Sequence, residues 1–414
     1  MALTLTIDRI GGQGDGVARS EAGPVFAPLT LPGETIRAEV VDGRAEAIEI
    51  LTPSHERIAP VSPHYGDCGG CSLQHWAAEP YLEWKREQVL LALARERIEA
   101  EVATTVVTPA GVRRRLALHA RLGEDGQVRL GFKARKSWRL APIVECPVAD
   151  PRLIAAIPAL AAVVAPLMES PRSAPTLHVT QTLTGLDLDI TGIERRQGGP
   201  SRDAVLKAIA AAGRADLARL SLAGEILVEA RKPEVMFGRV AVALPAGGFL
   251  QASPPAEAAM VALTVEAAKG AKKIADLFCG AGTFTFPLAE LAPVVAADSA
   301  APAVAALKAA AARAGKLKPI TAEARDLFRR PMAPYDLRGC DVIVVDPPRA
   351  GAIEQTAQIA QTKATTVVGV SCNPQTFARD ARVLIDAGFR LERVTPIDQF
   401  LWSAHVELVG VFRR

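Results

Sequence analysis

The sequence has little cysteine, few aromatic residues and almost no net charge. Six cysteines in a chain of 414 residues are too sparse for a disulfide scaffold. Lysine and arginine number 48 against 45 aspartates and glutamates, so the overall charge does not indicate a nucleic-acid partner. Aromatic residues make up 5% of the chain, while 49% is hydrophobic and 22% is charged. This composition is typical of a soluble globular protein whose apolar residues are largely Ala, Val and Leu.

Long apolar runs are also missing. The most apolar stretch, 153–168, is shorter than the ~20 residues that a membrane span needs, and Pro158 and Pro166 interrupt it. Residues 1–9 lack the basic region and apolar core of a signal peptide. We therefore expect a cytoplasmic, reducing location and no membrane partner. The length of the chain predicts two or three domains, which makes the protein a multidomain α/β chain.

Three segments differ in their expected architecture. Residues 1–55 hold about five short strand patterns separated by Gly- and Pro-rich turns, which predict a small OB-like β-barrel. Residues 56–250 predict a central α+β domain that begins with a cysteine loop at 56–75. A helix is expected over 77–105, and we expect it to pack on the domain that follows. Residues 251–414 form that last domain.

Strands and helices alternate regularly in the last domain. Apolar runs over 274–278, 294–297, 342–345 and 366–371 are separated by helical or loop stretches. This alternation predicts a mostly parallel, doubly wound sheet of the Rossmann-like kind. Ligands bind such sheets at the carboxyl ends of the strands, so the residues that follow each run are the first candidates for a site.

The turn after the first of these runs predicts a nucleoside-binding loop. Gly280 and Gly282 let the backbone approach a ligand closely, and the next helix offers free N–H groups. A dinucleotide site prefers G-x-G-x-x-G, and the third glycine is missing here. Asp298, at the end of the next run, suits a ribose diol. A ligand with an adenosine but no pyrophosphate fits better, and S-adenosylmethionine is such a ligand.

A nucleophile follows the fourth run. Cys372 comes directly after 366–371 and therefore lies at the same sheet edge as Asp346. A thiolate in that position can attack an electrophilic carbon. Such chemistry also needs a base, for which Glu407 is the nearest C-terminal candidate. The residues alone leave this role open, because most glutamates are solvated at the surface.

Five motifs in a fixed order resemble those of the RNA uracil-5-methyltransferase family. They are GGFLQ (247–251), DLFCGAGTFTFPLA (276–289), VDPPRAG (345–351), VSCNPQTFARD (370–380) and HVEL (405–408). The resemblance implies that Cys372 adds to C6 of a uracil and that C5 then takes the methyl group of S-adenosylmethionine. It also implies that Glu407 removes the C5 proton, after which elimination frees Cys372.

The same resemblance implies a set of binding residues. The side chains expected to contact S-adenosylmethionine or the target base are Gln251, Phe278, Thr283, Asp298, Asp326 and Asp346. Phe249 is expected to stack on the uracil. The chain departs from the family pattern at Ser253, where Asn is usual, and at Ala310-Ala311, where Asn-Ala is expected.

Three cysteines resemble the cluster ligands in the ribosomal-RNA branch of the family. Cys68 and Cys71 form a C-x-x-C pair, Cys146 matches a third position, and Ser62 stands where the branch has its first cysteine. The resemblance implies a [4Fe–4S] cluster held by these cysteines. The residue types alone leave zinc and bare reduced thiols open as alternatives. A cluster here would be structural, because uracil methylation transfers no electrons.

Charge is distributed unevenly between two candidate RNA-binding segments. Residues 1–55, which resemble a TRAM domain, hold four basic and eight acidic side chains, whereas 106–150 hold nine basic and four acidic ones. The second segment is the better candidate for contacts with phosphates and unpaired bases, through Arg135, Lys136 and Trp138. A uracil inside a helix is inaccessible at C6, so the target must be looped out or flipped.

These features together predict an S-adenosylmethionine-dependent RNA uracil-5-methyltransferase, expected to be a monomer without an obligate protein partner. The barrel and the cysteine loop favour 23S ribosomal RNA as the substrate, and transfer RNA is the alternative. An RNA-binding or folding factor with dispensable catalysis is a second class of function, which the Cys372 and Glu407 pair argues against.

Overall fold

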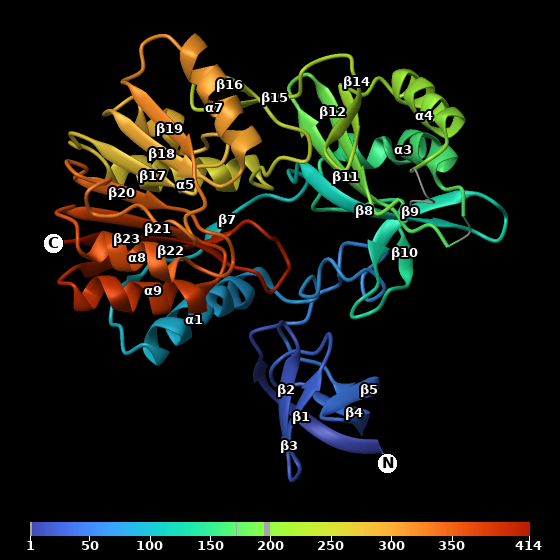
Figure 1. The fold of residues 1–414 in the computed structure, drawn as a ribbon. Helices are drawn as coiled ribbons and strands as arrows, with labels where there is room; N and C mark the ends of the chain where they lie inside the picture. Colours follow the sequence, from blue (N-terminus) through green and yellow to red (C-terminus); the bar gives the residue numbers. More distant parts are fainter. Residues whose placement is uncertain (1, 171, 194–198) are drawn as a thin grey trace.

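The computed structural model describes residues 2–170, 172–193 and 199–414, which form three parts (Figure 1). They contain a closed five-stranded barrel, a seven-stranded sheet and a nine-stranded sheet. In Figure 1 the barrel lies at the bottom, and the two sheets lie side by side above it. Within these residues, no helix combines the length and apolar character that crossing a membrane requires.

The N-terminal segment forms the predicted barrel. Its strands are β1 (Ala2–Ile10), β2 (Gly16–Ser20), β3 (Gly23–Ala27), β4 (Thr35–Val41) and β5 (Arg44–Thr52), joined in the order β1-β2-β3-β5-β4. Leu5, Ile7, Val25 and Ile36 belong to the buried core of the barrel. Leu5 and Ile7 are two residues apart, so the alternation of side chains along a strand directs both toward the interior.

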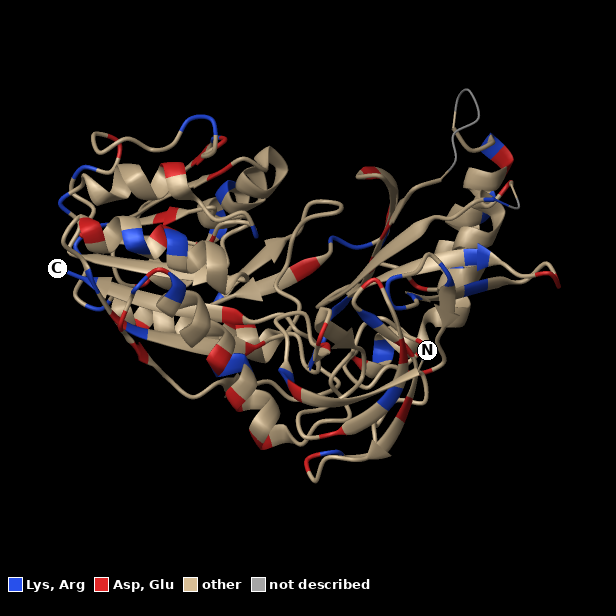
Figure 2. Cartoon of the chain, turned by 90° about the horizontal axis from the view of Figure 1, so that it is seen from below, with Lys and Arg blue, Asp and Glu red and all other residues tan. Residues whose placement is uncertain are grey.

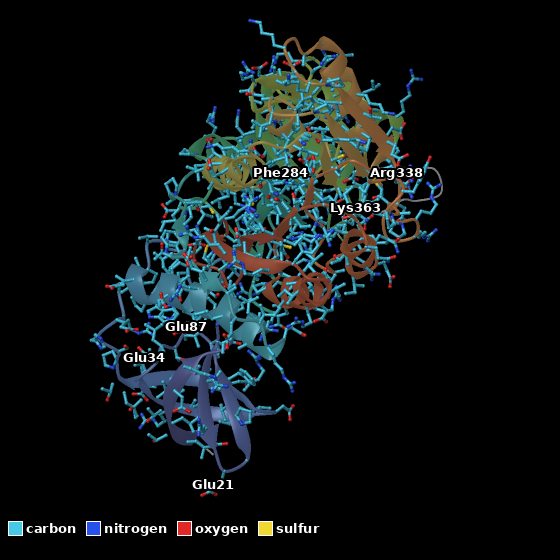
Figure 3. The ribbon with its side chains drawn as sticks, turned by 90° about the vertical axis from the view of Figure 1, so that its left-hand side faces the viewer. Glu21, Glu34, Glu87, Phe284, Arg338 and Lys363 are labelled. Carbon is cyan, nitrogen blue, oxygen red and sulfur yellow. The ribbon has the colours of Figure 1, made fainter. Side chains whose placement is uncertain are left out.

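One end of the barrel is fixed to the rest of the chain. Figure 3 labels Glu34 at the end that faces helix α1 (Ala78–Arg95) and Glu21 at the opposite tip. Glu34 is fully buried and accepts a hydrogen bond of 2.6 Å from Nε of Arg57. From α1, Nε1 of Trp84 donates a bond of 3.3 Å to the carbonyl of Ile10. The barrel is therefore joined to α1 by the Trp84 bond and to the segment before the helix by the Arg57 bond.

The central sheet has helices on one face. Its strands, in the order β10-β9-β8-β11-β12-β13-β14, are β8 (Arg115–Leu122), β9 (Val128–Lys133), β10 (Leu140–Pro142), β11 (Thr176–Thr182), β12 (Gly185–Thr191), β13 (Arg219–Leu222) and β14 (Glu225–Glu229). The covering elements are α2 (Pro151–Ala155), α3 (Ile157–Val164), η1 (Ala165–Leu167) and α4 (Arg202–Arg214). Leu118 and Val179 from the sheet share one core with Leu160 and Ala208 from the helices.

The C-terminal sheet is the doubly wound one that the alternation predicts. Its strands are β17 (Ile274–Leu277), β18 (Val294–Asp298), β19 (Ile320–Ala324), β20 (Val342–Val345), β21 (Thr366–Ser371), β22 (Arg390–Asp398), β23 (Glu407–Arg413), β6 (Glu101–Val102) and β7 (Val106–Val107). The order is β19-β18-β17-β20-β21-β23-β22-β6, and β7 also pairs with β22. Strands β17 to β21 are parallel, whereas β23 lies antiparallel between β21 and β22.

Helices cover both faces of this sheet. One face holds α5 (Pro254–Ala267), α6 (Thr285–Leu288) and α7 (Ala301–Arg313), and the other holds α1, α8 (Ile353–Ala360) and α9 (Pro374–Asp386). The helix expected over 77–105 ends at Arg95, and the chain then adds β6 and β7 to the sheet edge. A hairpin of β15 (Glu234–Phe237) and β16 (Val240–Ala243) buries Val235 and Phe237 in the same core as Met260 of α5.

Candidate active site

Strand register gathers the predicted residues at one edge of the C-terminal sheet. Leu277 pairs with Val345 in parallel strands, so Phe278 and Asp346 follow side by side. Strand β21 ends at Ser371, which pairs with Leu408 of antiparallel β23. The next residue along β21 and the preceding residue along β23 are Cys372 and Glu407. These two side chains therefore face each other across the end of the strand pair.

A cavity of about 830 Å³ opens at this edge. Most predicted site residues line it, namely Phe249, Gln251, Phe278, Asp298, Asp346, Cys372 and Glu407. This volume is in the range of small-molecule and cofactor sites. Thr283 and Asp326 are not among the lining residues. We call this cavity the cofactor lobe.

The loop after β17 has the backbone that a close ligand contact requires. Gly280 has φ of +53°, and a Cβ added there would meet open space. A Cβ on Gly282, at φ +107°, would lie 2.5 Å from the ring of Phe286, so only glycine fits. The carboxylate of Asp298 accepts a bond of 2.9 Å from the N–H of Gly280 and one of 2.7 Å from that of Ala300. These two bonds fix the carboxylate of Asp298 against the loop.

An aromatic pair forms another part of the cavity wall. The ring centroids of Phe278 and Phe328 lie 5.5 Å apart. Phe278 has the left-handed φ of +63°, a strained conformation for a non-glycine residue. Asp326 accepts a hydrogen bond of 3.0 Å from the N–H of Phe328, so it shapes the loop rather than the cavity surface. The sequence reasoning missed Phe328, whose flat apolar ring suits a purine.

Three acidic groups of the cavity have raised pKa values. Burial raises the pKa of Asp346 to about 8, and the charges of Glu407 and Asp298 add to this effect. Burial also raises the pKa of Glu407 to about 7. The Cys372 thiol has its pKa raised to about 11 by burial and by the carboxylates of Glu407 and Asp346. At neutral pH the thiol is protonated, and Glu407 is balanced between its two protonation states.

A hydrogen-bonded chain of amides links two of these carboxyl groups. Nε2 of Gln399 lies 2.9 Å from Oε1 of Gln251 and 3.2 Å from Oε1 of Glu407. Nε2 of Gln251 in turn lies 3.5 Å from Oδ2 of Asp346. Gln399 is buried and was not predicted as a site residue. A signal for it exists, because it follows β22 and so lies near the start of the antiparallel strand β23.

A buried ion pair supports the loop between β22 and β23. Nζ of Lys85, from α1, contacts Asp398, and both side chains are 0% exposed. Lys85 also donates a bond of 2.8 Å to the carbonyl of His405. Tyr81 donates a bond of 2.9 Å to the other Asp398 oxygen. Helix α1 thereby fixes the segment that precedes Glu407.

The predicted stacking residue lies at the mouth of the cavity. Phe249 is 70% exposed, and the guanidinium of Arg115 lies 5.4 Å from its ring centroid. The neighbouring residue, Arg114, forms a 2.6 Å ion pair with Glu257 of α5. An exposed ring backed by a guanidinium can stack on an unpaired base.

Arg135 and Lys136, predicted to contact RNA, face the barrel. Both pair with Asp15, whose side chain is 3% exposed and also pairs with Arg44. They line a separate surface hollow with Trp138, which is 77% exposed and has Nζ of Lys133 3.7 Å from its ring centroid. Figure 2 shows basic and acidic residues interspersed over the chain. This hollow is separate from the cofactor lobe. Asp15 neutralises part of its positive charge.

The predicted iron–sulfur cluster is not supported. Cys68, Cys71 and Cys146 line a small cavity of about 20 Å³ together with Ser62, and they also line a larger cavity of about 500 Å³. Within the described residues, no three or more His, Cys, Asp or Glu side chains form a group able to hold a metal ion.

Comparisons with known proteins agree with this geometry. A family model described as tRNA (Uracil-5-)-methyltransferase matches residues 204–414. An RNA methyltransferase of Caulobacter vibrioides is 62% identical over 412 residues, which are 99% of both chains. The 23S rRNA (uracil(1939)-C(5))-methyltransferase RlmD of Halomonas elongata is 33% identical, over 97% of this chain and 88% of that protein. The chain belongs to the RNA uracil-5-methyltransferase family.

One solved structure is similar over the whole length. It is the Pyrococcus abyssi tRNA (uracil-54, C5)-methyltransferase in complex with S-adenosyl-L-homocysteine. The TM-score is 0.76 at 22% identity, covering 99% of this chain and 100% of that one. The chain therefore shares the overall fold of that enzyme.

Proposed function

We propose that the protein methylates C5 of an unpaired uridine in RNA through a covalent adduct with Cys372. When bound, S-adenosylmethionine would supply an electrophilic methyl group. Asp298 and the Gly280 loop would hold its ribose, and Phe278 with Phe328 would flank its adenine. The uridine must leave its base stack to reach this cavity.

Electrons and protons balance in the proposed sequence. Cys372 gives up its thiol proton to solvent, and its sulfur bonds to C6 of the uracil, which moves an electron pair onto C5 as an enolate. C5 uses that pair to form the new bond to the methyl carbon, whose bond to the donor sulfur breaks, so that its electron pair stays on the departing S-adenosylhomocysteine. Glu407 then takes the C5 proton, and the released pair expels the Cys372 sulfur.

The observation that carries the proposal is the register of β21 and β23. It sets Cys372 opposite Glu407 at the wall of the same cavity that Asp298 lines. A nucleophile and a base are needed on one substrate ring, and the methyl donor must reach the carbon between them. The pKa of Glu407, about 7, also suits a base that accepts and releases a proton near neutrality.

We propose 23S ribosomal RNA in the cytoplasm as the substrate, with the N-terminal barrel acting as a TRAM-type RNA-binding module. Support comes from the full-length similarity to a relative named for 23S rRNA. Transfer RNA is the second candidate, because the family model and the solved structure are both named for tRNA.

Mass mapping of 5-methyluridine in ribosomal and transfer RNA, from cells with and without the gene, tests the substrate. A methyl mark lost from one 23S uridine supports the proposal, whereas a loss confined to transfer RNA selects the alternative. If neither RNA loses a mark, the proposed function is wrong.

Covalent chemistry is tested with purified protein and the mapped RNA. Glu407→Gln is expected to lower turnover by roughly 10²–10⁴-fold and to accumulate an RNA–protein adduct that survives a denaturing gel. Cys372→Ala is the matched control and should give neither product nor adduct. An adduct formed by Cys372→Ala would contradict the assignment of the nucleophile.

A further inference from the structure

A second cavity, of about 500 Å³, extends from Cys372 toward the cysteine loop. It shares Arg113, Arg349, Cys372 and Phe400 with the cofactor lobe, so the two spaces meet at the nucleophile. We call it the second lobe. The proposed reaction does not use this space, because the acids and the cofactor loop all lie in the first one.

The two lobes differ in charge. The cofactor lobe is lined by the carboxyl groups of Asp298, Asp346 and Glu407. Among the described residues that line the second lobe there is no Asp or Glu, while Arg113 and Arg349 both contribute to it. Neither arginine forms an ion pair within the described parts of the chain. The second lobe therefore favours an anionic group such as a phosphate.

The second lobe also contains an aromatic platform. The guanidinium of Arg113 lies 5.6 Å from the ring centroid of Phe400, as that of Arg115 lies 5.4 Å from Phe249. Arg113 and Arg115 are two residues apart in extended backbone, so both point to the same side. Two similar arginine–phenylalanine pairs thus lie beside Cys372: Arg115 and Phe249 line only the cofactor lobe, whereas Arg113 and Phe400 line both lobes. The edge of His405 adds to the second pair, with its ring centroid 5.7 Å from Phe400.

We propose that the second lobe binds the nucleotide next to the target uridine in the same RNA strand. Its base stacks on Phe400, and its phosphate lies between Arg113 and Arg349. Stacking tolerates every base, since each has a flat face, and the arginines supply the charge that the backbone needs. This inference rests on the proposed function, since it presupposes a uridine that enters the cofactor lobe from an RNA strand.

The test uses the holoenzyme with a synthetic stem-loop that carries the mapped uridine. Two further stem-loops have an abasic residue directly 5′ or directly 3′ of that uridine. One of the two abasic RNAs is expected to raise KM roughly 10-fold with the wild-type protein, the loss of one stacked base. Phe400→Leu should raise KM for the intact RNA by a similar factor, and should not add to the effect of that abasic residue.

Tyr335→Leu is the matched control, because it removes another arginine–aromatic pair, 4.7 Å from Arg338, that does not line either lobe. It should leave KM for all three RNAs unchanged. Equal KM values for the intact and both abasic RNAs would overturn the inference while leaving the proposed function intact, and so would fully additive effects of Phe400→Leu and the abasic residue. If Phe400→Leu does not fold, the wild-type comparison alone decides. No methylation of the intact RNA would overturn the proposed function itself.

Discussion

The side-chain amide of Gln399 lies 3.2 Å from the carboxylate of Glu407 and is buried with it. The same nitrogen lies 2.9 Å from the side-chain amide oxygen of Gln251. An amide held in this way orients the carboxylate and favours its ionised form, which opposes the effect of burial on the pKa of Glu407. Gln399 is therefore a positioning residue, which acts on the reaction through Glu407.

The rate at which the C5 proton leaves the methylated adduct should depend on the ionisation of Glu407. A base works only when deprotonated, and the pKa of this carboxyl group is about 7. Under saturating substrates, the rate is expected to rise about tenfold per pH unit below pH 7 and to level off above it. Release of tritium from RNA labelled at C5 of the target uridine, measured in single turnovers from pH 5.5 to 9, gives this profile. A rate that falls as pH rises through 7 would contradict the role of Glu407 as the base.

Replacing Gln399 should move that profile. Gln399→Leu removes a hydrogen bond that lowers the pKa of Glu407, so the rising limb should shift to higher pH. The rate at pH 7 should fall about tenfold, while KM for the RNA changes little. In the Glu407→Gln background, Gln399→Leu should have no further effect on product release from the adduct. A loss of rate without a shift in the rising part of the pH–rate profile would indicate that Gln399 has a purely structural role.

The local sequence pattern predicted the ends of the strands well, for a physical reason. The parallel strands and the residues after them follow directly from apolar runs and turns, and the sheet then brings Asp346 and Cys372 to one edge. Gln399 could also have been predicted as the partner of Glu407, since it lies eight residues before Glu407 in a hairpin.

Contacts between distant segments were not predictable in this way. Lys85 and Asp398 are 313 residues apart, and nothing in the local pattern of either residue indicates the other. Arg135 was expected to contact RNA because it lies in a basic run, yet it meets Asp15, 120 residues earlier. Charge counts for a segment cannot show which cations another segment of the fold neutralises.

Metal content tests the structure of the cysteine loop. Within the described part of the chain, no group of three or more His, Cys, Asp or Glu side chains is arranged to hold a metal ion. Protein purified without oxygen is therefore expected to be colourless and to react with a thiol reagent at these cysteines once unfolded. Iron and acid-labile sulfide assays provide the measurement. Close to four atoms of each per chain would show that the loop rearranges around a cluster.

The buried ion pair under the β22–β23 loop should be sensitive to the loss of one partner. Lys85→Met leaves the Asp398 carboxylate buried without its cation, which is expected to lower the free energy of unfolding by about 3–5 kcal/mol. Lys85→Met with Asp398→Asn should recover much of that loss. Urea unfolding followed by tryptophan fluorescence reports on this region, because Trp84 lies on the same helix.

Lys207→Met is the control for that experiment. Lys207 pairs with Asp203 on α4, with side chains 65% and 74% exposed, so its loss should change the free energy of unfolding by less than about 0.5 kcal/mol. Equal effects of the Lys85 and Lys207 substitutions would mean that the buried pair contributes no more than a solvated one.

Asp15 joins the barrel to the hairpin of β9 and β10. Asp15→Asn removes the charge that Arg135 and Lys136 share, and a charge-assisted hydrogen bond of this kind is worth about 1.5–3 kcal/mol. The barrel should then open roughly 10–100-fold more often, and limited proteolysis after 52–57 should accelerate by that factor. Asp8→Asn, whose partner Arg19 is 86% exposed, is the control and should be cut like the wild type. If Asp15→Asn resists the protease as well as the control, the ion pairs of Asp15 contribute little to the attachment of the barrel, and the contacts of Glu34 and Trp84 and the apolar cluster around Ile10 and Leu31 hold it instead.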